Sequence, residues 1–200
     1  MSEPHAGEEP VTAQECSVRH TRRILRMRDA SFANATARAG PLTLDLEPDG
    51  RLASTFSTSQ EATIVALMAA GIAKATTGSV LIGDYDPRVQ SVHCKRIAGF
   101  VPHEPLQLDE RDFPRYIAYR AALWNIDSTA AQADARRLCE RLEGMHEAFS
   151  YPLIGALVAS PQLIVLDRPQ PAYAAQILRA VEGRALLSTH AHASNAAAFT

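Results

Sequence analysis

The sequence predicts an α/β fold with an added antiparallel element, and three observations lead to this prediction. Two short runs, "QLIVLD" (162–167) and "RALLSTH" (184–190), are almost continuously apolar, which is typical of parallel strands buried on both faces. Segments with the apolar spacing of helices precede and separate these runs. Near the N-terminal end, Leu42, Leu44 and Leu46 alternate with polar residues, which indicates a strand with one exposed face.

Strands dominate the N-terminal half of the predicted fold. The segment "ILRMRDASF" (24–32) alternates apolar and polar residues and is predicted to be a half-exposed strand. The segment "PLTLDLEPDGRLASTF" (41–56) contains two strand patterns around a Pro-Asp-Gly turn, so an exposed hairpin is expected there. Further strands are predicted within 76–87 and within 96–105, the second of which ends at Pro102.

One helix without a solvent face is predicted ahead of these last strands. Residues 62–70 are apolar almost all round, and Gly71 fits the position just past the helix end. Residues 143–152 fit either a loop or the start of a helix. Other helices are predicted from apolar periodicity at 112–124, 128–142, 153–160 and 172–183, and in the tail from residue 191.

Charge and cysteine content narrow the class of protein. The formal net charge is −2, which argues against a general nucleic-acid-binding protein, since such proteins present a basic face. The three cysteines are scattered without metal-ligand or redox spacing, which fits a reducing, cytosolic setting. No stretch reaches the roughly 18 apolar residues that cross a bilayer, so work at a membrane would need a partner.

The length of 200 residues fits one domain with a leader. Residues 1–20 are acidic, polar and rich in Glu, and they are predicted to be a disordered leader without the apolar core of a signal peptide. Residues 21–200 are predicted to form the domain. A short helical insert is expected within it at about 104–155.

Five segments, in this order and spacing, resemble the nucleotide-binding domain of an ABC transporter between about residues 23 and 195. The resemblance implies a P-loop NTPase-like fold, Mg·ATP as the cofactor, and a Walker A loop, a Q-loop, a Walker B strand and a switch histidine. The segments are "LDLEPDGRLAST" (44–55), "LMAAGIAKATTGSVLIGDYDP" (67–87), "IAGFVPHEP" (97–105), "ALVASPQLIVLDRP" (156–169) and "ALLSTH" (185–190).

The position that resembles the Walker A loop lacks most of the residues that hold phosphates. By resemblance, Ser59, Gln60, Glu61, Ala62 and Thr63 form its vestigial end, with Glu61 in place of a glycine and Ala62 in place of the lysine. Only Thr63 keeps the hydroxyl that binds Mg²⁺. At ~4 Å and an effective dielectric near 20, a carboxylate repels a phosphate oxygen by ~4 kcal/mol, so ATP is expected to bind weakly or not at all.

The other positions of the implied site are partly kept. Asp167 ends the strand that resembles Walker B and is implied, with Thr63, as a Mg²⁺ ligand if nucleotide binds at all. Arg168 replaces the catalytic glutamate and cannot act as a general base, because a guanidinium stays protonated. His103, at the Q-loop position, either reaches a metal or water or is a polar turn residue. His190 is either the switch histidine or simply a histidine that ends a strand.

With these losses, the resemblance predicts a degenerate ABC-type subunit without ATPase activity. Gly144 and Met145 are the only residues that match the signature motif. No cofactor is expected, or Mg·ATP if the nucleotide site is retained. The implied partners are a multi-span membrane subunit, contacted through Phe113–Trp124, a second ABC ATPase subunit, or a second copy in a homodimer. The expected location is the cytoplasm, at the inner face of the membrane through the partner.

Two alternatives stay open at this point. The first is a conventional ABC subunit that binds and hydrolyses ATP, which would use Thr63, Asp167 and His190. The second is a soluble binding protein with P-loop topology that uses the vacated cleft for another ligand.

The start of the predicted buried helix suggests why its phosphate-binding residues could be lost. Thr58 and Glu61 have the spacing of a capping box, in which a hydroxyl and a carboxylate satisfy free backbone N–H groups at the helix start. Those N–H groups are the donors that a phosphate would otherwise use. We therefore expect the helix to have replaced its ligand with its own side chains.

Overall fold

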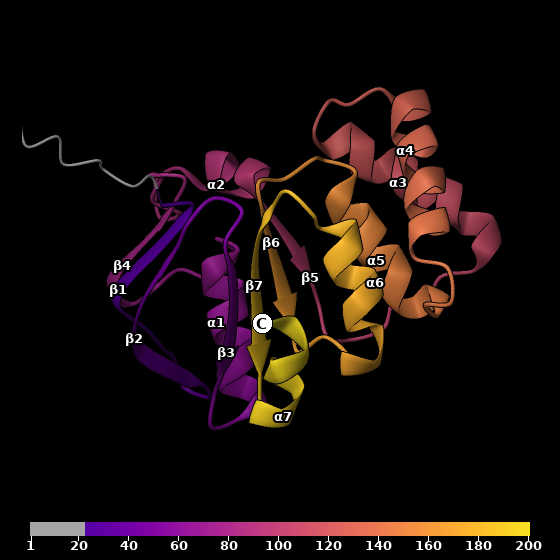
Figure 1. Ribbon diagram of the computed structural model, residues 1–200. Helices are drawn as coiled ribbons and strands as arrows, with labels where there is room; N and C mark the ends of the chain where they lie inside the picture. The colour runs from indigo at the N-terminus through magenta and orange to yellow at the C-terminus, as the bar shows by residue number, and fades with distance from the viewer. Residues whose placement is uncertain (1–22) are drawn as a thin grey trace, which may run out of the picture.

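The computed structural model describes residues 23–200, so the predicted leader at 1–20 lies outside the described residues. The described chain folds into two β-sheets with helices between and beside them (Figure 1). The antiparallel sheet has the order β2-β1-β4, with β1 (Leu25–Ala33), β2 (Arg38–Leu46) and β4 (Thr77–Ile82). The parallel sheet has the order β3-β7-β6-β5, with β3 (Arg51–Thr55), β5 (Ala98–Val101), β6 (Leu163–Asp167) and β7 (Ala185–His190). The predicted α/β fold class, with its antiparallel element, is confirmed.

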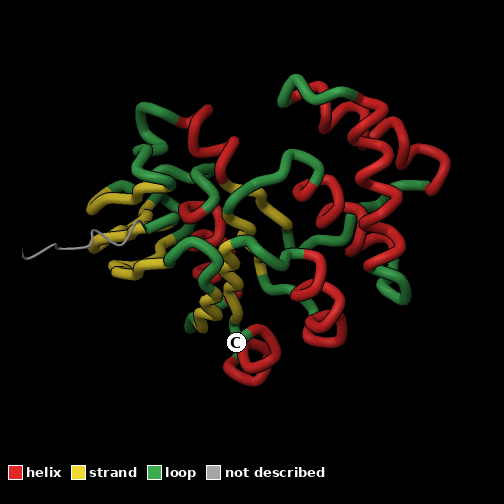
Figure 2. The backbone as a smooth tube through the Cα atoms, turned by 45° about the horizontal axis from the view of Figure 1, so that its top comes forward, coloured by secondary structure: helices red, strands yellow, loops and turns green. Residues whose placement is uncertain are grey.

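The helices fall into two groups, one beside the sheets and one farther out, and α3, α4 and α5 follow one another between β5 and β6. Figure 2 shows the outer group, α3 and α4, on the opposite side of the molecule from the antiparallel sheet. The helices are α1 (Ser59–Ala69), α2 (Ser91–Ile97), α3 (Phe113–Leu123), α4 (Ser128–Arg141), α5 (Glu147–Leu157), α6 (Ala174–Ala180) and α7 (Ala193–Ala196), with 3₁₀ turns η1 (Glu110–Asp112), η2 (Pro171–Tyr173) and η3 (Ala197–Phe199).

The expected hairpin over 41–56 is wrong, because its two strands belong to different sheets. β2 pairs with β1, whereas β3 pairs in parallel with β7. The turn between them, in which Gly50 donates its N–H to the Glu47 carbonyl at 3.1 Å, carries the chain from one sheet to the other. The Gly50 carbonyl then accepts from Leu186 of β7 at 2.9 Å, which sets the register of the parallel pair.

Helix α1 lies between the two sheets and contacts β2, β6 and β7 (Figure 1). This position explains why the helix is apolar almost all round. Gly71 ends it as predicted, in the left-handed conformation with φ 70°. Gly71 and Ile72 donate to the carbonyls of Met68 and Leu67 at 3.0 and 2.9 Å, the two bonds of a Schellman motif.

Strand β6 separates two hydrophobic cores, as its continuous apolar run predicts. Leu163 and Val165 pack with α1 and the antiparallel sheet, whereas Ile164 and Leu166 pack with the helices on the other face. All four side chains are at most 1 % exposed. The carboxyl ends of β6 and its neighbours are therefore held from both faces of the sheet.

Helix boundaries differ from the prediction at two places. Helix α2 was not predicted, because it is short and buries only Cys94. Helix α5 starts at Glu147 and runs through Pro152, so residues 143–152 include a helix start and the predicted boundary at 153 is too late. A proline in a helix leaves the carbonyl four residues earlier without its partner. Here that carbonyl belongs to Ala148, and it accepts instead from the N–H of Leu106 at 2.8 Å.

The start of α1 carries the predicted cap in a shifted form. The hydroxyl of Thr58 accepts from the N–H of Glu61 at 3.1 Å, as a capping box requires. The carboxylate of Glu61 accepts from Ser57 at 3.2 Å, one residue before the expected Thr58 N–H. The helix start is therefore closed by its own side chains.

We predict that Thr58→Ala lowers the free energy of unfolding by about 1 kcal/mol, because the N–H of Glu61 loses its acceptor. Thr58→Ser is the matched control, since it keeps the hydroxyl, and it should stay close to the wild type. Chemical denaturation of the three proteins measures the difference. Equal midpoints for Thr58→Ala and the wild type would contradict the cap.

Candidate functional site

The candidate site lies where the four parallel strands end. Thr55, Val101, Asp167 and His190 are the last residues of β3, β5, β6 and β7. Asp167 lies opposite Thr189 in the sheet register, and Thr55 lies opposite His190. Ligands of open α/β sheets bind at the carboxyl ends of the strands, so this edge is where a ligand site is expected.

At this edge Thr63, Asp167 and Arg168 form one hydrogen-bonded cluster. The hydroxyl of Thr63 donates to Asp167 Oδ2 at 2.9 Å and accepts from Arg168 Nη2 at 3.1 Å. Arg168 Nε donates to Asp167 Oδ1 at 3.1 Å. The side chain of Asp167 is 1 % exposed and that of Arg168 is 19 % exposed, so the ion pair is largely shielded from water.

Hydrogen bonds also hold the backbone of Arg168. Its φ of 47° lies in the left-handed region, which a non-glycine residue adopts only at an energetic cost. Its N–H donates to the carbonyl of Thr189 at 2.9 Å. Its carbonyl lies 2.9 Å from His103 Nδ1, which must be the donor in this pair and therefore carries the ring proton. The predicted Q-loop residue is thus bound to protein backbone through Nδ1.

His190 lies deeper, with a side chain that the structure buries almost completely. Its Nε2 is 2.9 Å from the hydroxyl of Ser188, and its ring lies 5.5 Å from that of Phe199 in the C-terminal turn η3. Among the described residues, nothing bonds to its Nδ1. Burial lowers the pKa of His190 below its usual value, because the charged ring would lose its hydration. The fold therefore favours the neutral form of the His190 imidazole.

The starts of helices α1 and α5 are capped in similar ways. At α1, Thr58 caps the backbone and Glu61 stands in the first turn. At α5, His146 Nδ1 accepts from the N–H of Ala148 at 3.2 Å, and Glu147 stands in the first turn. The second cap was not predicted, because histidine is not among the residues favoured at helix starts and only its place before the helix marks it.

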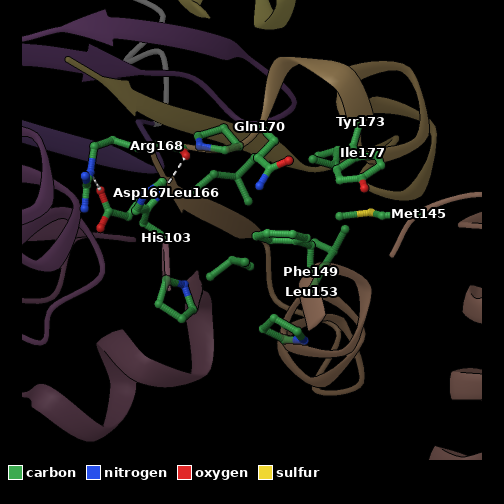
Figure 3. A pocket seen from close by; sticks show the side chains of 14 residues that line it. His103, Met145, Phe149, Leu153, Leu166, Asp167, Arg168, Gln170, Tyr173 and Ile177 are labelled. Atoms are coloured by element: carbon green, nitrogen blue, oxygen red, sulfur yellow. Dashed lines mark hydrogen bonds and ion pairs between the residues drawn. The ribbon is translucent and has the colours of Figure 1, made fainter. Parts of the chain in front are cut away.

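A cleft runs from the ion pair toward α5 and α6 (Figure 3). Asp167, Arg168, His103 and Gln170 are the polar residues of its wall. The remaining wall is mostly apolar and includes Met145, Phe149, Leu153, Leu166 and Ile177, together with Tyr173, whose ring carries a hydroxyl. A second cleft shares His103, Arg168 and Gln170 with it and reaches Ser59, His190 and His192.

The structure thus brings together some of the predicted site residues and separates others. Thr63, Asp167, Arg168 and His103 are connected by hydrogen bonds, whereas His190 bonds to Ser188 instead. Ser59, Gln60 and Glu61 form the first turn of α1, and Ala62 is fully buried behind them. Over residues 23–200, no group of three or more His, Cys, Asp or Glu side chains is arranged to hold a metal ion.

We predict that the neutral state of His190 makes unfolding sensitive to acid. Its pKa is lower in the folded chain than the ordinary value of 6.5, so the unfolded chain binds the proton first. The free energy of unfolding is therefore unaffected by His190 above about pH 6.5, and it decreases as the pH falls from there through the lower pKa of the folded chain. Between pH 7.5 and 5.5 the wild type should lose more free energy of unfolding than His190→Gln. Parallel losses in the two proteins would contradict the assignment.

Comparisons with known proteins bear on the fold. No family model and no curated protein matches the sequence. Solved structures do match. An ATP-binding subunit of an ABC transporter has a TM-score of 0.67 and 14% identity, over 86% of this chain and 81% of its own. CbiO1 from Clostridium perfringens, part of the ABC transporter complex cbiONQ, has a TM-score of 0.67 and 13% identity, over 85% and 79%.

A bacterial Atm1-family ABC exporter with ATP bound also matches, with a TM-score of 0.63 and 14% identity. The match covers 86% of this chain and 35% of the exporter chain. At sequence identities this low, the comparison shows a similar fold of the backbone and nothing more. The chain therefore has the P-loop NTPase-like fold of the ATP-binding subunits of ABC transporters.

Proposed function

We propose that this chain is an ABC-type subunit that does not hydrolyse ATP and works as a structural or regulatory partner of a membrane subunit or of an active ATPase. The observation that carries the proposal is the placement of Arg168. It follows the last residue of β6, where the resemblance expects a glutamate, and its guanidinium binds Asp167 and Thr63.

Hydrolysis needs a group that orients and deprotonates the attacking water. A guanidinium stays protonated and has no acceptor, so Arg168 cannot serve in this way. Asp167 and Thr63 are the residues that would bind Mg²⁺, yet Asp167 Oδ1 and the Thr63 hydroxyl already accept from the cationic side chain of Arg168, and Asp167 Oδ2 accepts from Thr63. As arranged, these residues do not fit a divalent metal ion beside Arg168, because the two cations would repel each other at close range.

The starts of helices α1 and α5 also support the proposal, because their N–H groups are not free to bind phosphates. In nucleotide-binding folds of this kind, backbone N–H groups at a helix start bind the phosphates. Here Thr58 and His146 occupy N–H groups at the starts of α1 and α5. Glu61 and Glu147 add negative charge to the same turns, which favours the helix dipole and opposes a phosphate.

A partner surface is available on the side of α2 and α3. Five apolar side chains are at least 49 % exposed: Val92 in α2, Tyr119 and Leu123 in α3, and Ile72 and Val89 in the loops after α1 and before α2. A groove nearby is lined by Ile72, Phe100 and Trp124 and by the cations Lys95 and Arg120. Exposed apolar groups next to a groove are typical of protein contact sites. We propose this surface, which includes part of the predicted segment Phe113–Trp124, as the site for a membrane subunit.

The proposed partner would also determine where the chain works. Within residues 23–200, no helix is long and apolar enough to span a bilayer. We propose that the chain lies in the cytoplasm at the inner face of the membrane and reaches it through the membrane subunit. Two of the similar structures come from transport assemblies, the cbiONQ complex and an exporter with ATP bound.

The proposal predicts that titration with Mg·ATP gives no measurable heat below millimolar ligand and that ATP turnover stays at the level of Asp167→Asn. This variant is the matched control, because it removes the carboxylate that any conventional site would need. Calorimetry and phosphate release measure the two quantities. Micromolar affinity, or turnover that Asp167→Asn abolishes, would contradict the proposal, and such turnover would support the conventional ATPase.

A second experiment separates the partner role from a soluble binding protein. Co-purification of the tagged full chain with a membrane protein and an active ATPase would support the partner role. A chain that stays monomeric and binds a small ligand in the cleft of Figure 3 would support the binding protein.

A further inference from the structure

The two oxygen-bearing side chains that would hold a metal ion at the strand edge are already bridged by a cation from the same chain. We propose that the guanidinium of Arg168 is a permanent internal cation that latches α1 to the end of β6, in the place where the resemblance expects Mg²⁺. Helix α1 then stays in contact with the carboxyl end of β6 without any bound nucleotide. This inference rests on the proposed function, since it assumes that Mg·ATP does not compete for the position.

The contacts have the geometry that such a latch needs. Thr63 and Asp167 are 104 residues apart in sequence and come from different elements. The side chain of Arg168 reaches both, through Nε to Asp167 and through Nη2 to Thr63. A planar guanidinium presents its donors in fixed and separate directions, so it can bridge two acceptors that a single ammonium point charge would bind less well.

The burial of Asp167 makes this cation necessary. A carboxylate with 1 % exposure has lost its hydration and needs an opposite charge or several donors. Among the described side chains, the donors to it are Thr63 and Arg168. Arg168 therefore supplies the positive charge that a metal ion would supply in a loaded nucleotide site.

The backbone of Arg168 extends the latch to two further elements. Its N–H is bound to Thr189 of β7, and its carbonyl is bound by His103 in the loop after β5. These bonds hold the residue in the left-handed conformation, with φ 47°, that aims the side chain at α1. A conformation with an energetic cost persists only where surrounding bonds fix it. Here Arg168 is bonded to α1, β6, β7 and the loop after β5.

A second ion pair in the chain serves as a control for the alternative that the Arg168–Asp167 pair contributes no more than an exposed pair. Arg137 and Asp134 form a pair whose side chains are 68 % and 45 % exposed. Exposed pairs contribute little to stability. Removal of Arg137 should therefore leave the melting temperature within about a degree of the wild type, whereas removal of Arg168 should not.

The test is thermal unfolding of the full chain with MgCl₂ or with NaCl of equal ionic strength. Arg168→Met, which keeps an apolar stem without charge, should melt about 10 °C below the wild type, because Asp167 is left buried and unpaired. Mg²⁺ should recover part of this loss in Arg168→Met but should not raise the melting temperature of the wild type. In Arg168→Met/Asp167→Asn the response to Mg²⁺ should vanish, because the charge that attracts the ion is gone.

A milder series keeps the proposal testable if Arg168→Met does not fold. Thr63→Val removes one acceptor of the guanidinium and one donor to Asp167, and it should lower the melting temperature by about 3 °C. Arg168→Lys keeps the charge without the fork, and Thr63→Val should have a smaller effect in that background. Equal effects of Thr63→Val in both backgrounds would overturn the latch, as would equal melting of Arg168→Met and Arg137→Met.

These outcomes are separate from those that bear on the proposed function, because no nucleotide is used. Micromolar binding of Mg·ATP by a wild type that still shows the coupling between Arg168 and Thr63 would overturn the proposed function and the permanence of the latch. Loss of the coupling, with no ATP binding, would overturn the latch alone.

Discussion

The strand edge depends on one buried charge, the carboxylate of Asp167, and on the guanidinium that neutralises it. Breaking a buried ion pair by removing one partner commonly costs 3–5 kcal/mol, whereas an exposed pair contributes at most about 1 kcal/mol. The guanidinium of Arg168 also bonds to Thr63 of α1, and hydrogen bonds to its own backbone, including the one from His103, hold it in the conformation that makes this contact. The parallel sheet provides the frame, because residues of β6 and β7 are buried on both faces and cannot shift to release the pair.

The same physical solution appears at two helix starts that lie far apart in sequence. Helices α1 and α5 each have a side-chain cap and a glutamate in the first turn. Free N–H groups at a helix start carry a partial positive charge, and a fold that binds phosphate leaves them open. Here Thr58 and His146 accept from N–H groups at the two exposed helix starts, which a side-chain acceptor stabilises. The caps supply acceptors that a phosphate would supply, and in our proposal Arg168 supplies the positive charge that a metal ion would supply.

Much of the fold could be predicted because burial leaves a clear pattern in the sequence. Strands β6 and β7 were predicted from their apolar runs, α1 from its lack of a polar face, and its cap from the spacing of Thr58 and Glu61. Helix α2 was missed because it exposes most of its residues and has almost no apolar stripe. The expected hairpin failed because strand patterns do not say which partner a strand pairs with.

The site was less predictable, because its chemistry depends on where side chains point. The identity of Arg168 excludes a general base, and this follows from the sequence alone. The contact between the Arg168 side chain and Thr63 depends on a backbone conformation that arginine rarely adopts. No spacing of residues in the sequence indicates that conformation. The cap by His146 was missed because histidine is not among the residues favoured at helix starts, although its Nδ1 can accept a hydrogen bond.

Pro152 gives the molecule a mechanical linkage. The carbonyl of Ala148 that the proline leaves free is bound by Leu106, three residues after His103 in the same loop. Helix α5 therefore cannot be pulled away from this loop without breaking a main-chain hydrogen bond. His103 in turn holds the carbonyl of Arg168. A force applied to α5 would thus travel along a short chain of bonds to the end of β6, so a residue that usually weakens a helix here ties it to the sheet edge.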